Sequence, residues 1–173
     1  MPTDGQKAPE AVVCRLATLA DAEPAGELAA QVFAGVSFEH LVEQEYGLLN
    51  GTTWQQRKAQ EIREEMAAEP QSAIVAEAGG RLIGFVTTRL NERSAVGRIL
   101  NLAVAADWQG RGIGKRLLAE AYRLLRDRGA KYLQIETLET NDVGKHLYPK
   151  LGFREMVRKI YYFMGVEEWQ GPQ

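Results

Sequence analysis

The strongest constraint on the fold is a succession of three patterns in the second half of the chain. The run GRILNLAVAA (residues 97–106) is almost continuously apolar, which is typical of a strand buried on both faces. From residue 113 to 128 apolar residues recur at helical spacing, and Gly129 ends that run. The run YLQIETL (residues 132–138) predicts another strand. The sequence therefore places a strand–helix–strand crossover at the centre of the fold.

The patterns on either side of this crossover predict further strands and helices. Gly79 and Gly80 separate two β-prone runs, which is a strong signal for a hairpin. Pro70 stops a helical pattern that begins at Thr53, and residues 35–53 give no clear assignment. The remaining predicted elements are a strand at 12–18, a helix at 21–33, a short helix at 141–152 and a last strand at 153–166. Their order, βααβββαβαβ, predicts an α/β protein with a mixed α+β sheet.

The length and composition fit one domain. The chain has 173 residues, 45% of them hydrophobic and 25% charged, which leaves enough apolar surface for a single core. Residues 1–10 are polar and contain Pro and Gly, so we expect them to form a flexible N-terminal arm. We expect residues 11–166 to form the domain and residues 167–173 a C-terminal tail.

The charge and the cysteine content argue against several classes of protein. The formal net charge of -2 gives no electrostatic reason to expect a nucleic acid or an anionic membrane as partner. Cys14 is the only cysteine, which excludes a disulfide within the chain, and His40 and His146 are not in metal-ligand spacing. No apolar run is long enough to span a membrane, and the N-terminus lacks the pattern of a signal peptide. We therefore expect a cytoplasmic protein without a metal site.

The glycine-rich run DWQGRGIGKRLL (residues 107–118) predicts a binding site for a phosphate group. A P-loop is excluded, because its glycines lie further apart and Arg116 stands where magnesium needs a serine or threonine. A dinucleotide-binding turn is also excluded. Such a turn directly follows the first strand of a doubly wound sheet, and this run does not. What remains is Q-x-x-G-x-G, with Gln109, Gly112 and Gly114 at the start of a helix, whose free N–H groups and dipole attract an anion. Because no hydroxyl is offered to magnesium, the expected ligand is a pyrophosphate that needs no metal.

Two motifs in this region resemble those of one enzyme family. ILNLAVAADWQGRGIGKRLL is similar to the pyrophosphate-binding motif of the GCN5-related N-acetyltransferases, the GNAT family. IETLETNDVGKHLYPKLGF is similar to the strand–helix motif that follows it in that family, and the match covers residues 98–153. The resemblance implies an acyl-CoA N-acyltransferase fold, in which a central twisted mixed sheet has splayed fourth and fifth strands and flanking helices. It also implies acetyl-CoA as co-substrate and a homodimer.

The resemblance assigns the residues that hold acetyl-CoA. The pantetheine arm is expected in the gap between the strand that ends near Val104 and the strand at 132–138, where backbone groups of the first strand pair with it. Asn141 is expected to support the arm, although its position also suits an ordinary helix N-cap. The expected cofactor-binding residues are Leu102, Ala103, Val104, Gln109, Gly110, Arg111, Gly112, Ile113, Gly114, Lys115 and Asn141.

The same resemblance assigns two catalytic residues. Acetyl transfer to an amine requires loss of a proton from the alkylammonium, a donor for the developing oxyanion and a proton for the departing thiolate. Tyr148 matches the family tyrosine near the sulfur and is the expected general acid, and the backbone N–H of Leu102 is the expected oxyanion donor. Glu136 is the expected base, with an ion-paired surface glutamate and a water chain as alternatives. Pro149 departs from the family pattern, and a bend there would move the Tyr148 hydroxyl.

The motifs do not identify the acetyl acceptor. Cys14 has no histidine spaced to activate it, which favours direct attack by a primary amine in a ternary complex. The acids and aromatics of residues 33–54 suit a cationic small molecule, and they equally suit a helix surface with its core anchors. They are Glu39, Glu43, Glu45, Phe38, Tyr46 and Trp54. The predicted acceptor is a small amine or amino-acid-like molecule. The alternatives are a protein or peptide amine and a non-catalytic acyl-CoA-binding regulatory module.

Overall fold

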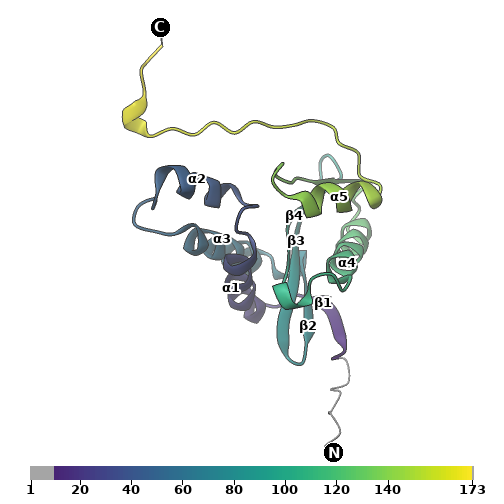
Figure 1. Cartoon of the computed structure of the whole chain (residues 1–173). Helices are drawn as coiled ribbons and strands as arrows, with labels where there is room; N and C mark the ends of the chain where they lie inside the picture. The colour runs from purple at the N-terminus through teal and green to yellow at the C-terminus, as the bar shows by residue number, and fades with distance from the viewer. Residues whose placement is uncertain (1–9, 173) are drawn as a thin grey trace, which may run out of the picture.

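A five-stranded sheet forms the middle layer of the molecule (Figure 1). The computed structural model describes residues 10–172, so nearly all of the predicted arm at residues 1–10 lies outside the described residues. The strands follow one another across the sheet in chain order, and they are β1 (Val12–Leu16), β2 (Ala73–Ala78), β3 (Arg81–Asn91), β4 (Val96–Val104) and β5 (Tyr132–Ile135). β4 and β5 are parallel and the other neighbours are antiparallel. The predicted mixed sheet with a central crossover is therefore confirmed.

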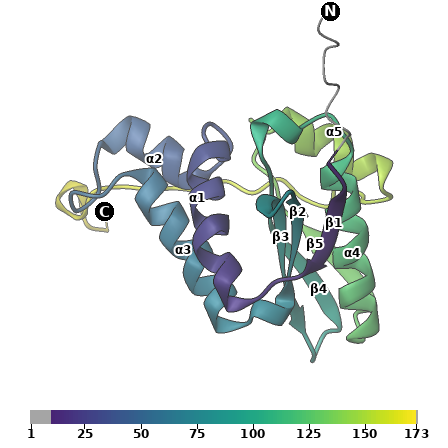
Figure 2. The same cartoon turned by 90° about the horizontal axis from the view of Figure 1, so that it is seen from below.

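Helices cover both faces of the sheet (Figure 2). One face carries α1 (Ala22–Val32) and α3 (Trp54–Ala68), and the opposite face carries α4 (Ile113–Asp127). The other α-helices are α2 (Phe38–Tyr46) and α5 (Asp142–Lys150), and the short 3-10 helices are η1 (Leu19–Asp21), η2 (Pro70–Ser72), η3 (Ala106–Trp108) and η4 (Val166–Glu168). Each face buries its own apolar cluster, and Phe85 of β3 and Leu117 of α4 are fully buried on opposite faces.

Local signals in the sequence explain where several elements begin and end. Gly79 and Gly80 both have positive φ, as a tight hairpin between β2 and β3 requires, so the predicted hairpin is confirmed. Thr53 caps α3, because its hydroxyl accepts a hydrogen bond from the backbone N–H of Gln56 and its own backbone N–H donates to the Gln56 side-chain oxygen. Gly129 has a φ of 96° directly after the last turn of α4.

An ion pair ties β1 to the start of α1. The Arg15 guanidinium donates to both oxygens of Asp21 at 2.8 Å and to Glu77 at 2.9 Å. Asp21 is nearly fully buried and accepts a further hydrogen bond from the backbone N–H of Thr18. Chiefly through Arg15, these contacts lower the pKa of Asp21 from 3.8 to about 2. The charged form of Asp21 is therefore part of the folded state.

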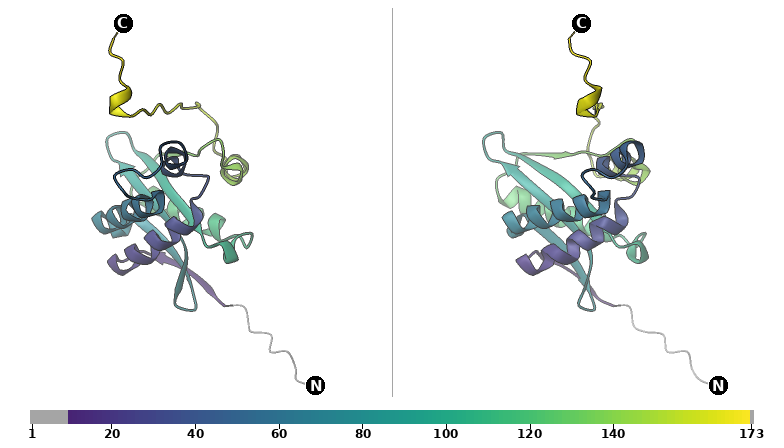
Figure 3. Two further views of the ribbon diagram at one scale, coloured as in Figure 1. Left: turned by 60° about the vertical axis from the view of Figure 1, so that its left-hand side comes forward. Right: turned by 90° about the vertical axis from the view of Figure 1, so that its left-hand side faces the viewer.

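The C-terminal segment differs from the prediction. The predicted strand at 153–166 does not form, and this part of the chain runs extended from α5 to α2 outside the sheet (Figures 1 and 3). We call residues 153–169 the strap. Tyr161 packs on Phe38 of α2 with ring centroids 4.9 Å apart, and the Tyr46 hydroxyl of α2 donates to the carbonyl of Phe163. The strand prediction is wrong because these aromatic contacts draw the segment away from the edge of β5.

Two further boundaries also differ. The region at 35–53, which gave no clear assignment, contains α2, and Ser37 caps this helix by accepting from the backbone N–H of His40. β5 ends at Ile135, although the apolar pattern extends to Leu138. A strand needs a hydrogen-bonding partner, and β4 accompanies β5 only as far as Ile135.

Candidate active site

β4 and β5 separate part-way along their length. Their parallel pairing runs from Val96 opposite Tyr132 to Ile99 opposite Ile135 and stops there. At the same point the register between β3 and β4 shifts by one residue, which leaves Leu100 without a partner in β3. A small cavity of about 50 Å³ opens where the strands part, lined by Arg98, Ile99, Leu100, Gln134, Ile135 and Glu136. We call it the strand gap. Beyond it, β4 continues to Val104, and no strand from residues 10–172 lies beside it on the β5 side, as predicted for splayed strands.

The glycine-rich turn leads directly into α4. Gly110 and Gly112 have φ values of 75° and 78°, in the left-handed region that favours glycine. Gly112 is the N-cap, and the first intrahelical bond of α4 joins the N–H of Arg116 to the Gly112 carbonyl. The N–H groups of residues 113–115 thus have no acceptor within the helix. Free N–H groups at the positive end of a 15-residue helix can bind an anion.

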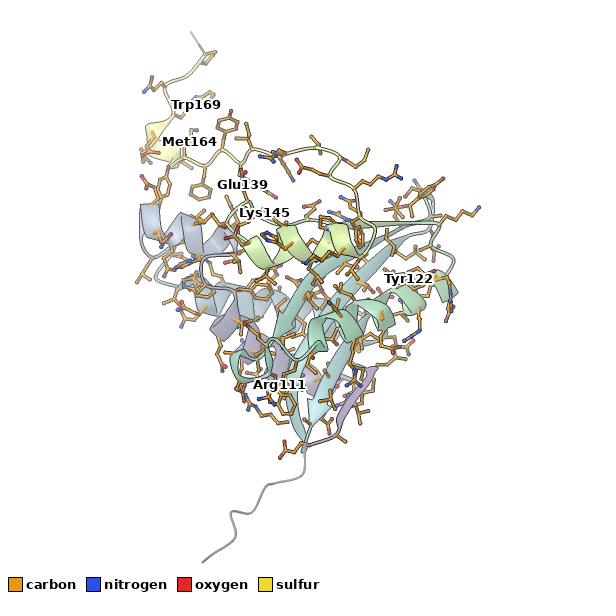
Figure 4. All side chains as sticks on the ribbon, turned by 45° about the vertical axis from the view of Figure 1, so that its right-hand side comes forward. Arg111, Tyr122, Glu139, Lys145, Met164 and Trp169 are labelled. Carbon is orange, nitrogen blue, oxygen red and sulfur yellow. The ribbon has the colours of Figure 1, made fainter. Side chains whose placement is uncertain are left out.

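Several side chains around this turn stabilise it, so only part of the predicted set is free to contact a ligand. The Gln109 amide donates to the Val104 carbonyl at 3.0 Å and so ties the turn to the end of β4. The Arg111 guanidinium stacks over the Trp108 ring at 4.8 Å and lies at the start of α4 (Figure 4). Ile113 is buried in the core, which leaves only its backbone for a ligand. Arg116 donates to the Val12 carbonyl and is therefore occupied by β1.

The predicted residues of β4 offer backbone groups rather than side chains. Ala103 packs into the cluster beneath α1 and α3, and Leu102 and Val104 pack against the cluster beneath α4. A Cβ on Gly114 would meet the side chains of Val104 and Leu102 at 3.9 and 4.0 Å, so the first turn of α4 lies directly over this part of β4. The free edge of β4 and the free N–H groups of α4 therefore lie next to each other. This arrangement fits a ligand with an extended amide arm and a pyrophosphate.

α5 starts just beyond the strand gap and carries Tyr148. Asn141 caps the helix by accepting from the backbone N–H of Gly144 at 3.0 Å. Gly144 allows a very close approach: a Cβ there would lie 2.8 Å from Thr137 Oγ1 and 3.0 Å from Tyr148 Cε2. Thr137 follows β5 by two residues. The Tyr148 ring is thus held beside the end of β5.

The surroundings of Tyr148 keep its hydroxyl protonated. The side chain is partly buried against the cluster beneath α4, and its ring contacts Phe153 edge to face with centroids 6.2 Å apart. Burial raises the pKa of the Tyr148 hydroxyl above its ordinary value. The hydroxyl makes no hydrogen bond to any of residues 10–172, and Pro149 lies in the last turn of α5, which continues to Lys150. A protonated hydroxyl with a free donor can act as a general acid.

Glu136 lies at the mouth of the strand gap as half of an ion pair. Its carboxylate accepts from Arg98 of β4 at 2.8 Å and from the Gln134 side chain at 3.0 Å. Both members of the ion pair are partly exposed. Both donors bind the same carboxylate oxygen, Oε1. Glu136 thus places a carboxylate at the entrance of the strand gap. Its ion pair matches the alternative interpretation from the sequence, an ion-paired surface glutamate.

The comparisons with known proteins agree with this arrangement. Residues 37–153 match the model of the acetyltransferase (GNAT) family. The chain belongs to the GNAT family. Over 117 residues it is 32% identical to an aminoglycoside N(6')-acetyltransferase type 1 of Stenotrophomonas maltophilia, a match that covers 62% of this chain and 76% of that protein. It is 30% identical over 117 residues to a mycothiol acetyltransferase of Rhodococcus jostii, a match that covers 64% of this chain but only 38% of that longer protein.

A solved structure shares the GNAT fold of this chain. The PaiA N-acetyltransferase of Thermoplasma acidophilum, in complex with coenzyme A, superposes with a TM-score of 0.66 at 23% identity, over 83% of this chain and 90% of that one. The fold class predicted from the two motifs is therefore confirmed. The roles of the individual site residues stay predictions.

Some features of this GNAT site were not predicted from the sequence. Gly144 is part of the N-x-x-[AG] motif, but no spacing rule shows that its missing Cβ makes room for Tyr148. The ion pair of Arg98 with Glu136 depends on the parallel register of β4 and β5. The third is the partly buried carboxylate of Glu65 on α3, which is hydrogen-bonded to Asn101 of β4. All three depend on contacts between elements that sequence periodicity does not reveal.

The region proposed from sequence to choose the acceptor is largely occupied by structural contacts. Glu43 accepts hydrogen bonds from the backbone N–H of Trp54 and from Arg57. Trp54 is buried and stacks on His40. Glu43 and Trp54 therefore fit the second alternative for this region, a helix surface with its core anchors, and not a site for a cationic small molecule. Within residues 10–172 no helix is long and apolar enough to cross a membrane, and no group of three or more His, Cys, Asp or Glu residues is arranged to hold a metal.

Proposed function

We propose that this GNAT domain transfers an acetyl group from acetyl-CoA to a primary amine of a small molecule, directly and in a ternary complex. One observation carries the proposal. β4 loses its β5 neighbour after Ile99, and the free edge that this leaves lies next to the free N–H groups of α4, while the partly buried Tyr148 lies beside the end of β5. An arm lying along β4 would run from those N–H groups towards the end of β5. Acetyl-CoA supplies a thioester, whose acyl carbon accepts the amine.

The residues that would hold the co-substrate are those of the turn and of β4. The N–H groups of residues 113–115 and the charges of Arg111 and Lys115 would bind the pyrophosphate. The free edge of β4 between Leu102 and Val104 would pair with the pantetheine arm as a neighbouring strand does, and the N–H of Leu102 would stabilise the developing negative charge on the acyl oxygen. Asn141 would support the arm while it caps α5.

Two side chains would move or attract protons. Tyr148 would protonate the leaving thiolate, since its raised pKa keeps the proton available at neutral pH. Glu136 would attract the ammonium form of the acceptor. The amine proton would pass to Glu136, whose carboxylate is ion-paired with Arg98, or to a chain of water. If Glu136 is the base, Glu136→Gln lowers kcat; if it only attracts the acceptor, the same change raises KM.

The named relatives support an amine acceptor, since one is an aminoglycoside N(6')-acetyltransferase. The assay is release of coenzyme A thiol with aminoglycosides, polyamines, amino acids and peptides as acceptors. We expect turnover with a small amine, and a large loss of kcat in Tyr148→Phe with little change in the Kd for acetyl-CoA. Tyr122→Phe is the control, because Tyr122 is half exposed on α4 (Figure 4). Turnover only with peptides would overturn the small-molecule acceptor. Tight acetyl-CoA binding without turnover on any amine would overturn the enzyme in favour of a binding module.

The proposal includes a homodimer and a cytoplasmic location, which rest on the family and the sequence. The strap supports the homodimer, because Met156, Ile160 and Tyr162 are 88%, 73% and 89% exposed in a β-prone extended segment. The outer edge of β5 has no partner strand among residues 10–172. A strap exchanged between two copies about a twofold axis would cover both surfaces.

Light scattering after gel filtration tests the homodimer. We expect the wild-type chain to elute as a dimer and Ile160→Asp with Tyr162→Asp as a monomer. Val143→Asp, at an equally exposed site on α5, should leave the dimer intact. A wild-type chain that stays monomeric at high micromolar concentration would refute strap exchange.

A further inference from the structure

A second cavity lies on the face of the sheet that α3 covers, and β4 separates it from the strand gap. Its volume is about 280 Å³, and it is bounded by α3, η2, β2 and β3. We call it the α3 cavity. Hydroxyl groups of Ser72, Thr87 and Thr88 line it together with the charged side chains of Glu65 and Arg89. Its volume lies at the lower end of the range for ligand pockets, which suits one arm of a ligand.

The Glu65 carboxylate forms part of the wall of this cavity. Its side chain is only 15% exposed. One oxygen, Oε2, accepts from Thr87 Oγ1 at 2.9 Å and from Asn101 Nδ2 at 2.8 Å. The other oxygen, Oε1, accepts no hydrogen bond from residues 10–172, and its nearest cation is Arg89 at 3.7 Å. The carboxylate is therefore fixed by one oxygen and free to accept at the other.

The other charges around the cavity are already balanced or exposed. Glu69 pairs with Arg128 at 3.1 Å, and Glu61 pairs with Lys58 at 3.0 Å. The Arg89 side chain is 64% exposed, so water screens much of its attraction for Glu65. Burial raises the pKa of Glu65, which shows that the charged form is poorly solvated there. A cationic donor entering the cavity would stabilise that form.

The α3 cavity and the strand gap are linked through β4. Arg89, which lines the cavity, stands opposite Arg98, which lines the gap. Asn101, which holds Glu65, lies on β4 one residue after Leu100, which also lines the gap. Neighbouring strands lie about 4.8 Å apart, so β3 and β5 are separated by roughly 10 Å. A molecule that occupied both sites would need two binding groups about that far apart.

We infer that the α3 cavity binds a second cationic group of the acetyl acceptor, with its ammonium on Glu65 Oε1, while the reacting amine lies in the strand gap. The acceptor class is then an aliphatic diamine or a molecule with two amines at a comparable distance. Glu65 is a binding residue, and it selects the acceptor without touching the reacting atoms. The inference rests on the acetyl transfer proposed above and deepens it by naming the kind of acceptor.

Acetylation of a length series of diamines tests this inference. The series is ethylenediamine, putrescine, cadaverine, hexamethylenediamine and octamethylenediamine, and each is compared with the monoamine of equal length. We expect KM to pass through a minimum at one diamine length, about 10- to 100-fold below that of the monoamine, which is the range for a hydrogen bond to a charged group. Glu65→Gln should remove this advantage and leave the monoamine KM within about twofold.

A matched control and a second measurement keep the test independent of folding and of turnover. Glu64→Gln alters the neighbouring exposed residue of α3, whose carboxylate accepts from the Gln60 side chain at 2.7 Å, and should keep the length preference. Thermal melting without acetyl-CoA should show that the preferred diamine raises the Tm of the wild type and not of Glu65→Gln.

The outcomes separate this inference from the proposed function. Equal KM values for monoamines and diamines in active wild-type enzyme, or an unchanged length preference in Glu65→Gln, would overturn the cavity as a cation site while acetyl transfer stands. A diamine-dependent rise in Tm that needs Glu65, without acetylation of any amine, would support the cation site and overturn the proposed activity. No rise in Tm and no length preference would overturn the inference.

Discussion

Replacing Gly144 by alanine should slow acetyl transfer strongly. The added Cβ would lie 2.8 Å from Thr137 Oγ1 and 3.0 Å from Tyr148 Cε2. Ordinary contacts to carbon are about 3.5–4.0 Å, so the Tyr148 ring would have to move by about 0.5–1 Å. A misplacement of about 1 Å can cost about 10²-fold in rate. We therefore expect kcat of Gly144→Ala to fall by about 10- to 100-fold.

The folding stability of this variant should change much less than its rate. Alanine is favoured over glycine within a helix by about 1 kcal/mol, and this gain offsets part of the strain from the new contacts. The assay is thiol release under saturating acetyl-CoA, with thermal melting to show that the variant is folded. Thr137→Ala combined with Gly144→Ala removes the Oγ1 contact and should recover part of the lost rate. Val143→Ala, at the neighbouring exposed position, is the control.

Two results would refute this reasoning. A folded Gly144→Ala with unchanged kcat would show that Tyr148 does not act at the thioester, or that its ring position does not matter. A loss of rate matched by an equal rise in the Kd for acetyl-CoA would move the damage to Asn141, whose Nδ2 would lie 3.1 Å from the new Cβ.

Three further predictions concern stability and co-substrate binding. The pKa of Asp21 is lowered from 3.8 to about 2. At about 1.4 kcal/mol per pH unit, this shift contributes at most about 2.4 kcal/mol to the free energy of unfolding, and less because Arg15 is partly exposed to water. Urea unfolding should show Asp21→Asn losing that stability at neutral pH, with the difference disappearing as pH falls through 3.8 toward 2. The pKa of Glu65 is raised in the folded protein, so the charged carboxylate lowers the folding stability as pH rises through that pKa. Calorimetry should therefore show the stability of Glu65→Gln increasing relative to the wild type from acidic to neutral pH. A difference that stays constant with pH would refute this. Gly112→Ala should lower the folding stability and weaken acetyl-CoA binding. Gly129→Ala, at a glycine with positive φ at the other end of α4, should lower the stability by a similar amount and leave acetyl-CoA binding unchanged.

The sequence predicted best those parts of the fold that depend on local periodicity. The crossover from β4 through α4 to β5 follows from an apolar run, a helical pattern and the glycines at its ends. The hairpin at Gly79 and Gly80 follows from turn chemistry alone. The strap at 153–169 has the composition of a strand, but composition does not decide which edge a strand pairs with. Its prediction failed because Phe38 and Tyr46 of α2, a helix that the sequence did not reveal, bind its aromatic residues.

The site divides in the same way. The glycine-rich turn at the start of α4 was predictable because glycines and a helix start are local features, whereas its binding of an anion stays a prediction. The ion pair between Arg98 and Glu136 was not predictable in detail, since it needs the register of two strands about 38 residues apart. Glu65 and Asn101, which are separated by 36 residues, were likewise joined only by the fold.

The strand gap and the α3 cavity both cost the protein stability, and this is an argument for their use. A β4 paired with β5 along its whole length would satisfy more backbone groups, yet pairing stops at Ile99 where the bulge at Leu100 begins. A leucine at position 65 would avoid the cost of a buried carboxylate, yet Thr87 and Asn101 are arranged to hold Glu65 in place. Both departures lie along β4, on either side of it in the sheet. A chain selected for stability alone would have neither, whereas an enzyme that holds an extended thioester on one side of β4 and a cationic amine on the other needs both.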